Sequence, residues 1–188
     1  MNVLALTASP NKDGLTAAMA QAALVGAGKA GASTSLIALC DVEIEACRQC
    51  DNGWGTCRTE GHCVIDDDFE QVRRRIEAAD ALVISTPVYF GDLAEVAKCF
   101  LDRLRRTSLG EGKAELTAGR WALSIACAGG GGGGGPTTLV ALERYYGVLQ
   151  IPVFDAMIAT RRNREYMVEA ARQAGAALVK HAEANPRG

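Results

Sequence analysis

The sequence has no strong excess of charge of either sign, since 20 Lys and Arg residues stand against 22 Asp and Glu residues and the formal net charge is −2 at pH 7. Without a basic field, neither nucleic acid nor an anionic membrane surface is expected as the main partner. No apolar run is long enough to cross a bilayer. The segment Met1–Leu6 also lacks the basic start of a signal peptide, so we expect a cytoplasmic protein.

The sequence is also poor in catalytic motifs. Its two histidines are His62 and His181, and neither Gly-x-Ser-x-Gly nor His-Glu-x-x-His occurs. The first polar loop, Ser9–Thr16, contains neither the Gly-Lys-Ser/Thr of a P-loop nor the glycine fingerprint of a dinucleotide site. No catalytic side chain is therefore predicted.

What the sequence does contain is a regular alternation of strands and helices. Apolar runs predict strands at 2–7, 32–39, 81–84 (ended by Thr86-Pro87), 120–126 and within 148–158, and amphipathic patterns predict helices at 17–29, 69–79, 93–104, 136–146 and 163–184. Five strand–helix units without a repeat predict a doubly wound parallel sheet. The length of 188 residues suits one domain, with a cysteine-rich insertion at about 40–68.

Three loops differ from ordinary connections between strands and helices. Ser9–Thr16, Thr86–Asp92 and Ala128–Pro136 follow the first, third and fourth predicted strands. In the strand order 2-1-3-4-5 these strands are neighbours, and parallel sheets bind ligands at the carboxyl ends of their strands. We therefore expect the three loops to meet at one site.

The first two loops indicate a ligand with a phosphate at one end and a flat ring at the other. Ser9, Lys12 and Thr16 add donors to the unpaired N–H groups of a helix start, whereas Tyr89 and Phe90 fall outside any core periodicity. These features match the two ends of a flavin mononucleotide. The alternatives are an ordinary capped connection for the first loop and aromatic rings that cap the sheet for the second.

The same loops resemble those of the NAD(P)H-dependent FMN reductase and iron–sulfur flavoprotein branch of the flavodoxin-like superfamily. The first loop of that family typically reads Gly-Ser-Pro-Arg-x-x-(Gly/Ser)-Asn-Thr, and residues 8–16 match it in frame, with Asn11 in place of Arg and Leu15 in place of Asn. The segment 87–91, Pro-Val-Tyr-Phe-Gly, is almost letter for letter the family's isoalloxazine loop. The segment 100–103, Phe-Leu-Asp-Arg, matches the helix that follows this loop.

The resemblance implies a flavodoxin-like three-layer sandwich with a five-stranded parallel sheet in the order 2-1-3-4-5. It also implies bound FMN, NAD(P)H as co-substrate and a homodimer or tetramer. The third loop consists of glycine alone from 129 to 135, so it offers only backbone groups. The cofactor-binding residues that the resemblance implies are Ser9, Asn11, Lys12, Gly14, Leu15, Thr16, Pro87, Val88, Tyr89, Phe90, Gly91, Gly129 and Gly130.

Five of the seven cysteines lie within 40–68. Cys47, Cys50, Cys57 and Cys63 are spaced Cys-x2-Cys-x6-Cys-x5-Cys, which is similar to the family's Cys-x2-Cys-x2-Cys-x5-Cys with four additional residues in the middle. Four thiolates suit a [4Fe–4S] or [2Fe–2S] cluster or a structural zinc ion, and unligated thiols are the third alternative. The additional residues favour unligated thiols, because metal ligation tolerates little error in reach.

The leading functional hypothesis is an FMN-dependent NAD(P)H oxidoreductase that reduces quinones, free flavins or a similar small acceptor. An iron–sulfur flavoprotein that carries single electrons between its flavin, a cysteine-ligated cluster and a ferredoxin-like partner is the first alternative. A non-enzymatic electron carrier of the flavodoxin type is the second, although the nearly balanced charge argues against it.

Overall fold

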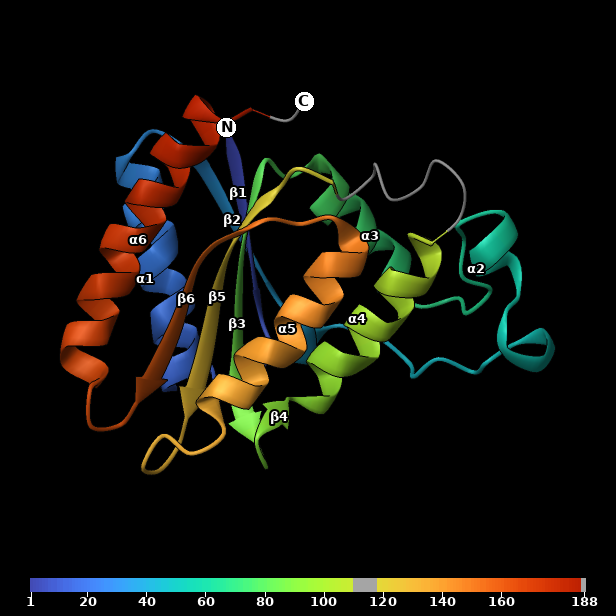
Figure 1. Cartoon of the computed structure of the whole chain (residues 1–188), viewed down its shortest axis with the longest axis horizontal. Coiled ribbons are helices and arrows are strands. Elements are labelled where there is room, and N and C mark those ends of the chain that lie inside the picture. The colour runs from blue at the N-terminus through green and yellow to red at the C-terminus, as the bar shows by residue number, and fades with distance from the viewer. Residues whose placement is uncertain (110–117, 187–188) are drawn as a thin grey trace.

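The computed structural model describes residues 1–109 and 118–186, and its centre is a twisted sheet with helices on both faces (Figure 1). The strands are β1 (Asn2–Thr7), β2 (Ser33–Ala38), β3 (Ala81–Tyr89), β4 (Asp92–Leu93), β5 (Trp121–Ala128) and β6 (Val153–Thr160). Their order is β2-β1-β3-β5-β6, with every pair parallel, and β4 adds a short antiparallel partner to β3. The predicted order 2-1-3-4-5 of the parallel strands is confirmed.

Two groups of helices complete the three layers (Figure 1). Helices α1 (Leu15–Lys29) and α6 (Arg164–Ala184) cover one face of the sheet, and α3 (Phe69–Ala78), α4 (Glu95–Thr107) and α5 (Gly135–Leu149) cover the other. The insertion adds the short elements η1 (Leu39–Asp41), η2 (Asp51–Gly53) and α2 (Thr56–Thr59). None of the described helices is long and apolar enough to span a membrane.

The alternation of side chains along the central strands divides the interior into two cores. In β1, Leu4 and Leu6 join the core under α3, α4 and α5, whereas Val3 and Ala5 join the core under α1 and α6. A central parallel strand is covered on both faces, which explains its unbroken apolar sequence. Each large side chain that is fully buried in this way contributes roughly 1.5–3 kcal/mol to the stability of the fold.

Two predicted boundaries around β3 are wrong. The strand does not stop at Thr86-Pro87 but continues to Tyr89. Pairing with β1 ends at Ser85 and only the β5 side is paired at Pro87, so the missing N–H of proline is tolerated there. Leu93 does not begin the next helix, because it pairs with Val88 in the β3–β4 hairpin and α4 starts at Glu95.

Helices α1 and α6 approach each other through glycine. A Cβ atom on Gly26 would lie 1.8 Å from the carbonyl oxygen of Arg172, and one on Gly175 would lie 1.9 Å from that of Ala23. Only a residue without a side chain allows this contact. Each glycine lies eleven residues after the first residue of its helix, and both helices follow parallel strands, so their N-termini lie at the same edge of the sheet.

We predict that Gly26→Ala lowers the free energy of unfolding by about 1–3 kcal/mol or more, because the backbones of α1 and α6 must separate to admit the methyl group. Gly28→Ala is the matched control, since a Cβ atom there would meet only the Thr34 methyl group at 4.0 Å. The control should be neutral or stabilising, as alanine favours a helix. Equal denaturation midpoints in urea for the two variants would contradict the close contact.

Candidate functional site

The first loop leaves the N-terminus of α1 open. The Ser9 hydroxyl accepts the backbone N–H of Asn11 at 3.2 Å, and the carbonyl of Asn11 accepts that of Gly14 at 3.2 Å. Gly14 is the N-cap residue of α1, and no side chain caps the helix. The N–H groups of the first turn, which begins at Leu15, therefore remain available to an anion.

Three further polar residues, Lys12, Thr16 and Thr7, lie in or next to the first loop. The Lys12 ammonium lies 2.7 Å from the Asp41 carboxylate, and both side chains are exposed, so this pair can rearrange. Thr16 is buried, and its carbonyl accepts the hydroxyl of Ser85 at 3.0 Å. Thr7, the last residue of β1, has a buried hydroxyl with no hydrogen-bond partner among the described residues. That hydroxyl stands directly before the loop.

Cys127 lies on the same side of the sheet as Ser85, beneath this loop. Burial raises the pKa of its thiol to about 11, although hydrogen bonds with Thr16 and Ser85 act in the opposite direction. The thiol therefore stays protonated at neutral pH. A buried, protonated cysteine on a core strand behaves as a small apolar residue.

The aromatic loop presents its rings to solvent. Pro87 is buried and Val88 half-buried, but Tyr89 is 46 % exposed and Phe90 is 109 % exposed. Phe90 has a φ of +52°, and Gly91 follows with +82°. A left-handed conformation costs a residue with a side chain roughly 1–2 kcal/mol. The chain thus holds a bare aromatic ring in a strained position at the carboxyl end of β3.

The glycine loop packs against the aromatic loop at Gly134 and is open at Gly129 and Gly130. A Cβ atom on Gly134, where φ is +81°, would lie 2.5 Å from the Cα of Gly91. The Thr137 hydroxyl donates to the carbonyl of Gly91, which links α5 to the aromatic loop. By contrast, Gly129 and Gly130 are exposed and have nothing within 4 Å of a Cβ position. The two loops form one rigid unit beside an open space.

We predict that Gly134→Ala destabilises the folded chain by roughly 1–3 kcal/mol, because it adds left-handed strain to a clash with Gly91. Gly133→Ala is the matched control, since a Cβ atom there meets nothing within 4 Å. Thermal unfolding of both variants measures the difference. Equal loss of stability at the two positions would show that the loops are not joined by this contact.

All four cysteines of the predicted metal motif line one small cavity of about 20 Å³, together with Arg103 and Arg106 of α4. The four thiols are half-buried and unpaired. The four additional residues between Cys50 and Cys57 are taken up by η2 and by the start of α2, so they do not carry Cys57 away from the cavity. In the part of the chain that the structure describes, no group of three or more His, Cys, Asp or Glu side chains is arranged to hold a metal ion.

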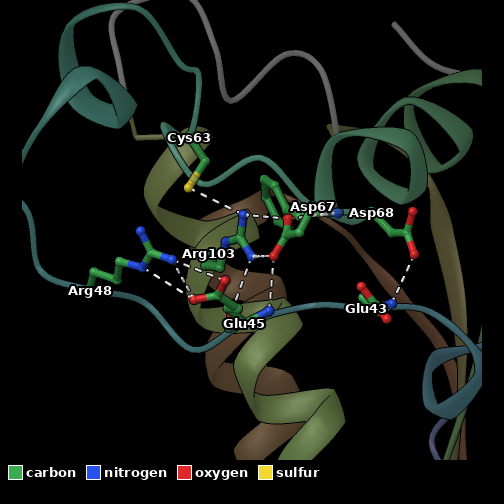
Figure 2. A network of polar contacts seen from close by, with 8 residues as sticks. Glu43, Glu45, Arg48, Cys63, Asp67, Asp68 and Arg103 are labelled. Atoms are coloured by element: carbon green, nitrogen blue, oxygen red, sulfur yellow. Dashed lines mark hydrogen bonds and ion pairs between the residues drawn. The ribbon is translucent and has the colours of Figure 1, made fainter.

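Arg103 ties this cavity to the core of the fold (Figure 2). Its guanidinium is 1 % exposed and forms an ion pair with Asp67, with Nη2 to Oδ1 at 2.9 Å. Nη2 also donates to the Sγ of Cys63 at 3.3 Å, and Nη1 donates to the carbonyl of Glu45 at 3.1 Å. The Phe69 ring lies 4.3 Å beneath the guanidinium carbon.

The ion pair shifts the pKa of both partners toward the charged forms. Burial raises the pKa of Asp67, but hydrogen bonds from Arg103 and from the backbone N–H groups of Glu45 and Phe69 lower it below its ordinary value. Burial likewise opposes the charge of Arg103, but Asp67 and Cys63 raise the pKa of the guanidinium. Both groups are therefore charged at neutral pH, in a setting with little water.

Sequence reasoning missed Arg103 as a functional residue. Two features of the sequence indicate a buried ion pair. Arg103 stands in the apolar stripe of α4 between Phe100 and Leu104, and residues 66–68 form an acidic run that can supply its partner. A second arginine, Arg106, donates to the carbonyl of Gly53 and lies 4.6 Å from the Trp54 ring. The insertion is thus anchored to α4 by arginine side chains.

Comparison with known proteins agrees with the fold and the loops. Residues 1–164 match the model of the family described as NADPH-dependent FMN reductase. An iron–sulfur flavoprotein of Methanocaldococcus jannaschii is 32 % identical over 110 residues, which is 58 % of this chain and 55 % of that protein. An iron–sulfur flavoprotein of Archaeoglobus fulgidus is 36 % identical over 110 residues, 58 % of this chain and 52 % of that protein. This chain therefore matches about half the length of these curated relatives.

Among solved structures, an NAD(P)H:quinone oxidoreductase from Methanothermobacter marburgensis superposes with a TM-score of 0.68 at 21 % identity. The match covers 95 % of this chain and 98 % of that one, and it confirms the flavodoxin-like fold. The family match spans the sheet and the three loops that the fold brings to one edge. The chain belongs to the NADPH-dependent FMN reductase family.

Proposed function

We propose that this chain is an FMN-dependent NAD(P)H oxidoreductase that reduces a small acceptor such as a quinone or a free flavin. The observation that carries the proposal is the joining of the aromatic and glycine loops, through Gly91, Gly134 and Thr137, at the sheet edge where α1 begins. When bound, FMN accepts a hydride from the nicotinamide and passes the electrons to the acceptor.

The residues at this edge fit such a cofactor. The uncapped first turn of α1 and the unpartnered hydroxyl of Thr7 are donors for a phosphate. The open backbone of Gly129 and Gly130 admits a flat ring, because no side chain fills that space. Phe90 and Tyr89 offer exposed rings next to it.

In this proposal the chain binds and orients, and it moves no proton of its own. Tyr89 and Phe90 would offer their rings to the flavin and would exclude water from it. The backbone N–H groups of Gly129 and Gly130 would be donors to it, since these residues have no side chain. The absence of a second phosphate-sized loop beside β1, β3 or β5 favours FMN over FAD.

Denaturation of the purified, flavin-loaded protein should release FMN, which chromatography identifies. Thr137→Val should weaken FMN binding by roughly 2- to 12-fold, because one neutral hydrogen bond of about 0.5–1.5 kcal/mol holds the two loops together. Val140→Ala is the control, since Val140 is 46 % exposed on the same helix. Release of FAD, or failure of the apoprotein to bind saturating FMN, would refute the proposal.

A second candidate function is favoured by the cysteine cavity. We propose that the chain can hold an iron–sulfur cluster there and pass single electrons to a ferredoxin-like partner. Thiolates from four cysteines are the usual ligands of a [4Fe–4S] cluster, and each binds a different iron, so the sulfurs surround a space and do not converge on one point. Cys47, Cys50, Cys57 and Cys63 line the same cavity, so the four thiols that a cluster needs lie in one region, and this supports the proposal.

Iron and acid-labile sulfide in anaerobically prepared protein test the second candidate. Cys57→Ser should remove both, whereas Cys99→Ser should keep them, because Cys99 lies on α4 outside the cavity. Protein without iron would leave the flavin as the redox group of the first proposal. Iron that survives Cys57→Ser would place the metal elsewhere in the chain.

A further inference from the structure

We propose that Arg103 is a positioning residue for the cysteine cavity, and that its hydrogen bond to Cys63 raises the reduction potential of an iron–sulfur cluster bound there. The inference rests on the second candidate function. It assigns a role to a side chain that belongs neither to the flavin site nor to the four-cysteine motif.

The position of Arg103 is fixed by its surroundings (Figure 2). Three acceptors hold the guanidinium, namely the Asp67 carboxylate, the Glu45 carbonyl and the Cys63 sulfur. The centroid of the Phe69 ring lies 4.3 Å from the guanidinium carbon. The remaining N–H group, on Nε, is buried without a partner among the described residues. A buried side chain held at so many points cannot move away from the sulfur without loss of the ion pair.

If Arg103 only held α4 to the insertion, it would not need its hydrogen bond to the Cys63 sulfur. Asp67 and the Glu45 carbonyl already anchor α4 to the insertion, and Arg106 adds a second anchor at Gly53. The bond from Nη2 to Cys63 Sγ, at 3.3 Å, instead aims a charged donor at a group that lines the cavity. This bond is the part of the network that bears on the chemistry of the cavity.

The direction of the effect follows from charge. A donor beside a ligating sulfur stabilises the electron-rich state of a cluster and so raises its reduction potential. The surroundings are poor in water, which strengthens the interaction. Asp67 acts in the opposite direction, because its negative charge offsets the guanidinium. The two partners of one ion pair therefore have opposite effects on the potential.

The experiment compares three variants of anaerobically prepared protein that contains its flavin and cluster. Arg103→Lys keeps the charge but loses the fork that reaches Cys63, and it should shift the midpoint potential of the cluster to a more negative value. Asp67→Asn removes the opposing charge and should shift it to a more positive value. Arg106→Lys is the matched control, because Arg106 lines the same cavity but bonds the Gly53 carbonyl and no sulfur.

Redox titration followed by electron paramagnetic resonance gives the potentials, and iron and sulfide content gives the occupancy. The flavin potential in the same sample is an internal reference that should not move. Shifts of opposite sign for Arg103→Lys and Asp67→Asn, with Arg106→Lys unchanged, would establish the inference. If Asp67→Asn does not fold, the test is whether the midpoint potential of the cluster shifts in Arg103→Lys and not in Arg106→Lys.

The negative outcomes separate the two proposals. A cluster whose potential is the same in Arg103→Lys and in the parent would overturn the inference and leave the second candidate function intact. Shifts of the same sign in the two ion-pair variants would also overturn it, because they would report a common loss of packing. A parent protein without iron and sulfide would overturn both.

Discussion

The site depends on one constraint, the adjacency of β1, β3 and β5 in a parallel sheet. Parallel strands end at the same edge of the sheet, so the loops that follow them lie close together although they are far apart in the sequence. The β3–β4 hairpin then turns the aromatic loop, and Thr137 fixes it against the start of α5. The close contact of α1 and α6 through glycine sets the position of the first loop relative to these two.

The insertion is held by a different kind of interaction. Removal of Arg103 and Asp67 from water costs several kcal/mol per charge, and only good geometry with further hydrogen bonds recovers it. The backbone N–H groups of Glu45 and Phe69 and the carbonyl of Glu45 supply those bonds. A pair of apolar side chains would hold the segment at less cost. The ion pair is therefore weak evidence for stability, which agrees with the role proposed for Arg103 at the adjacent cavity.

Much of the fold follows from local patterns. The bounds of β1 follow from an apolar run between loops, and α3 follows from the spacing of Phe69, Val72 and Ile76, whereas the strand order was implied by the family resemblance. Patterns failed where tertiary contacts decide, as at Pro87, which remains in a strand because one neighbour has ended. Local helical turns take up the additional residues before Cys57, which still lines the cavity, and whether the four thiols are ligated stays a prediction. The roles of the expected flavin-binding residues and the homo-oligomer stay predictions.

The exposed ring of Phe90 has a consequence for the energy balance of the free chain. Phe90 has a left-handed backbone conformation and a fully exposed ring, so it lowers the stability of the folded chain and contributes nothing to the core. A ligand that covers the ring recovers that cost only in the bound state. Because a ligand that binds only the folded state stabilises it, the melting temperature of this protein should rise with the fraction of molecules that hold the ligand.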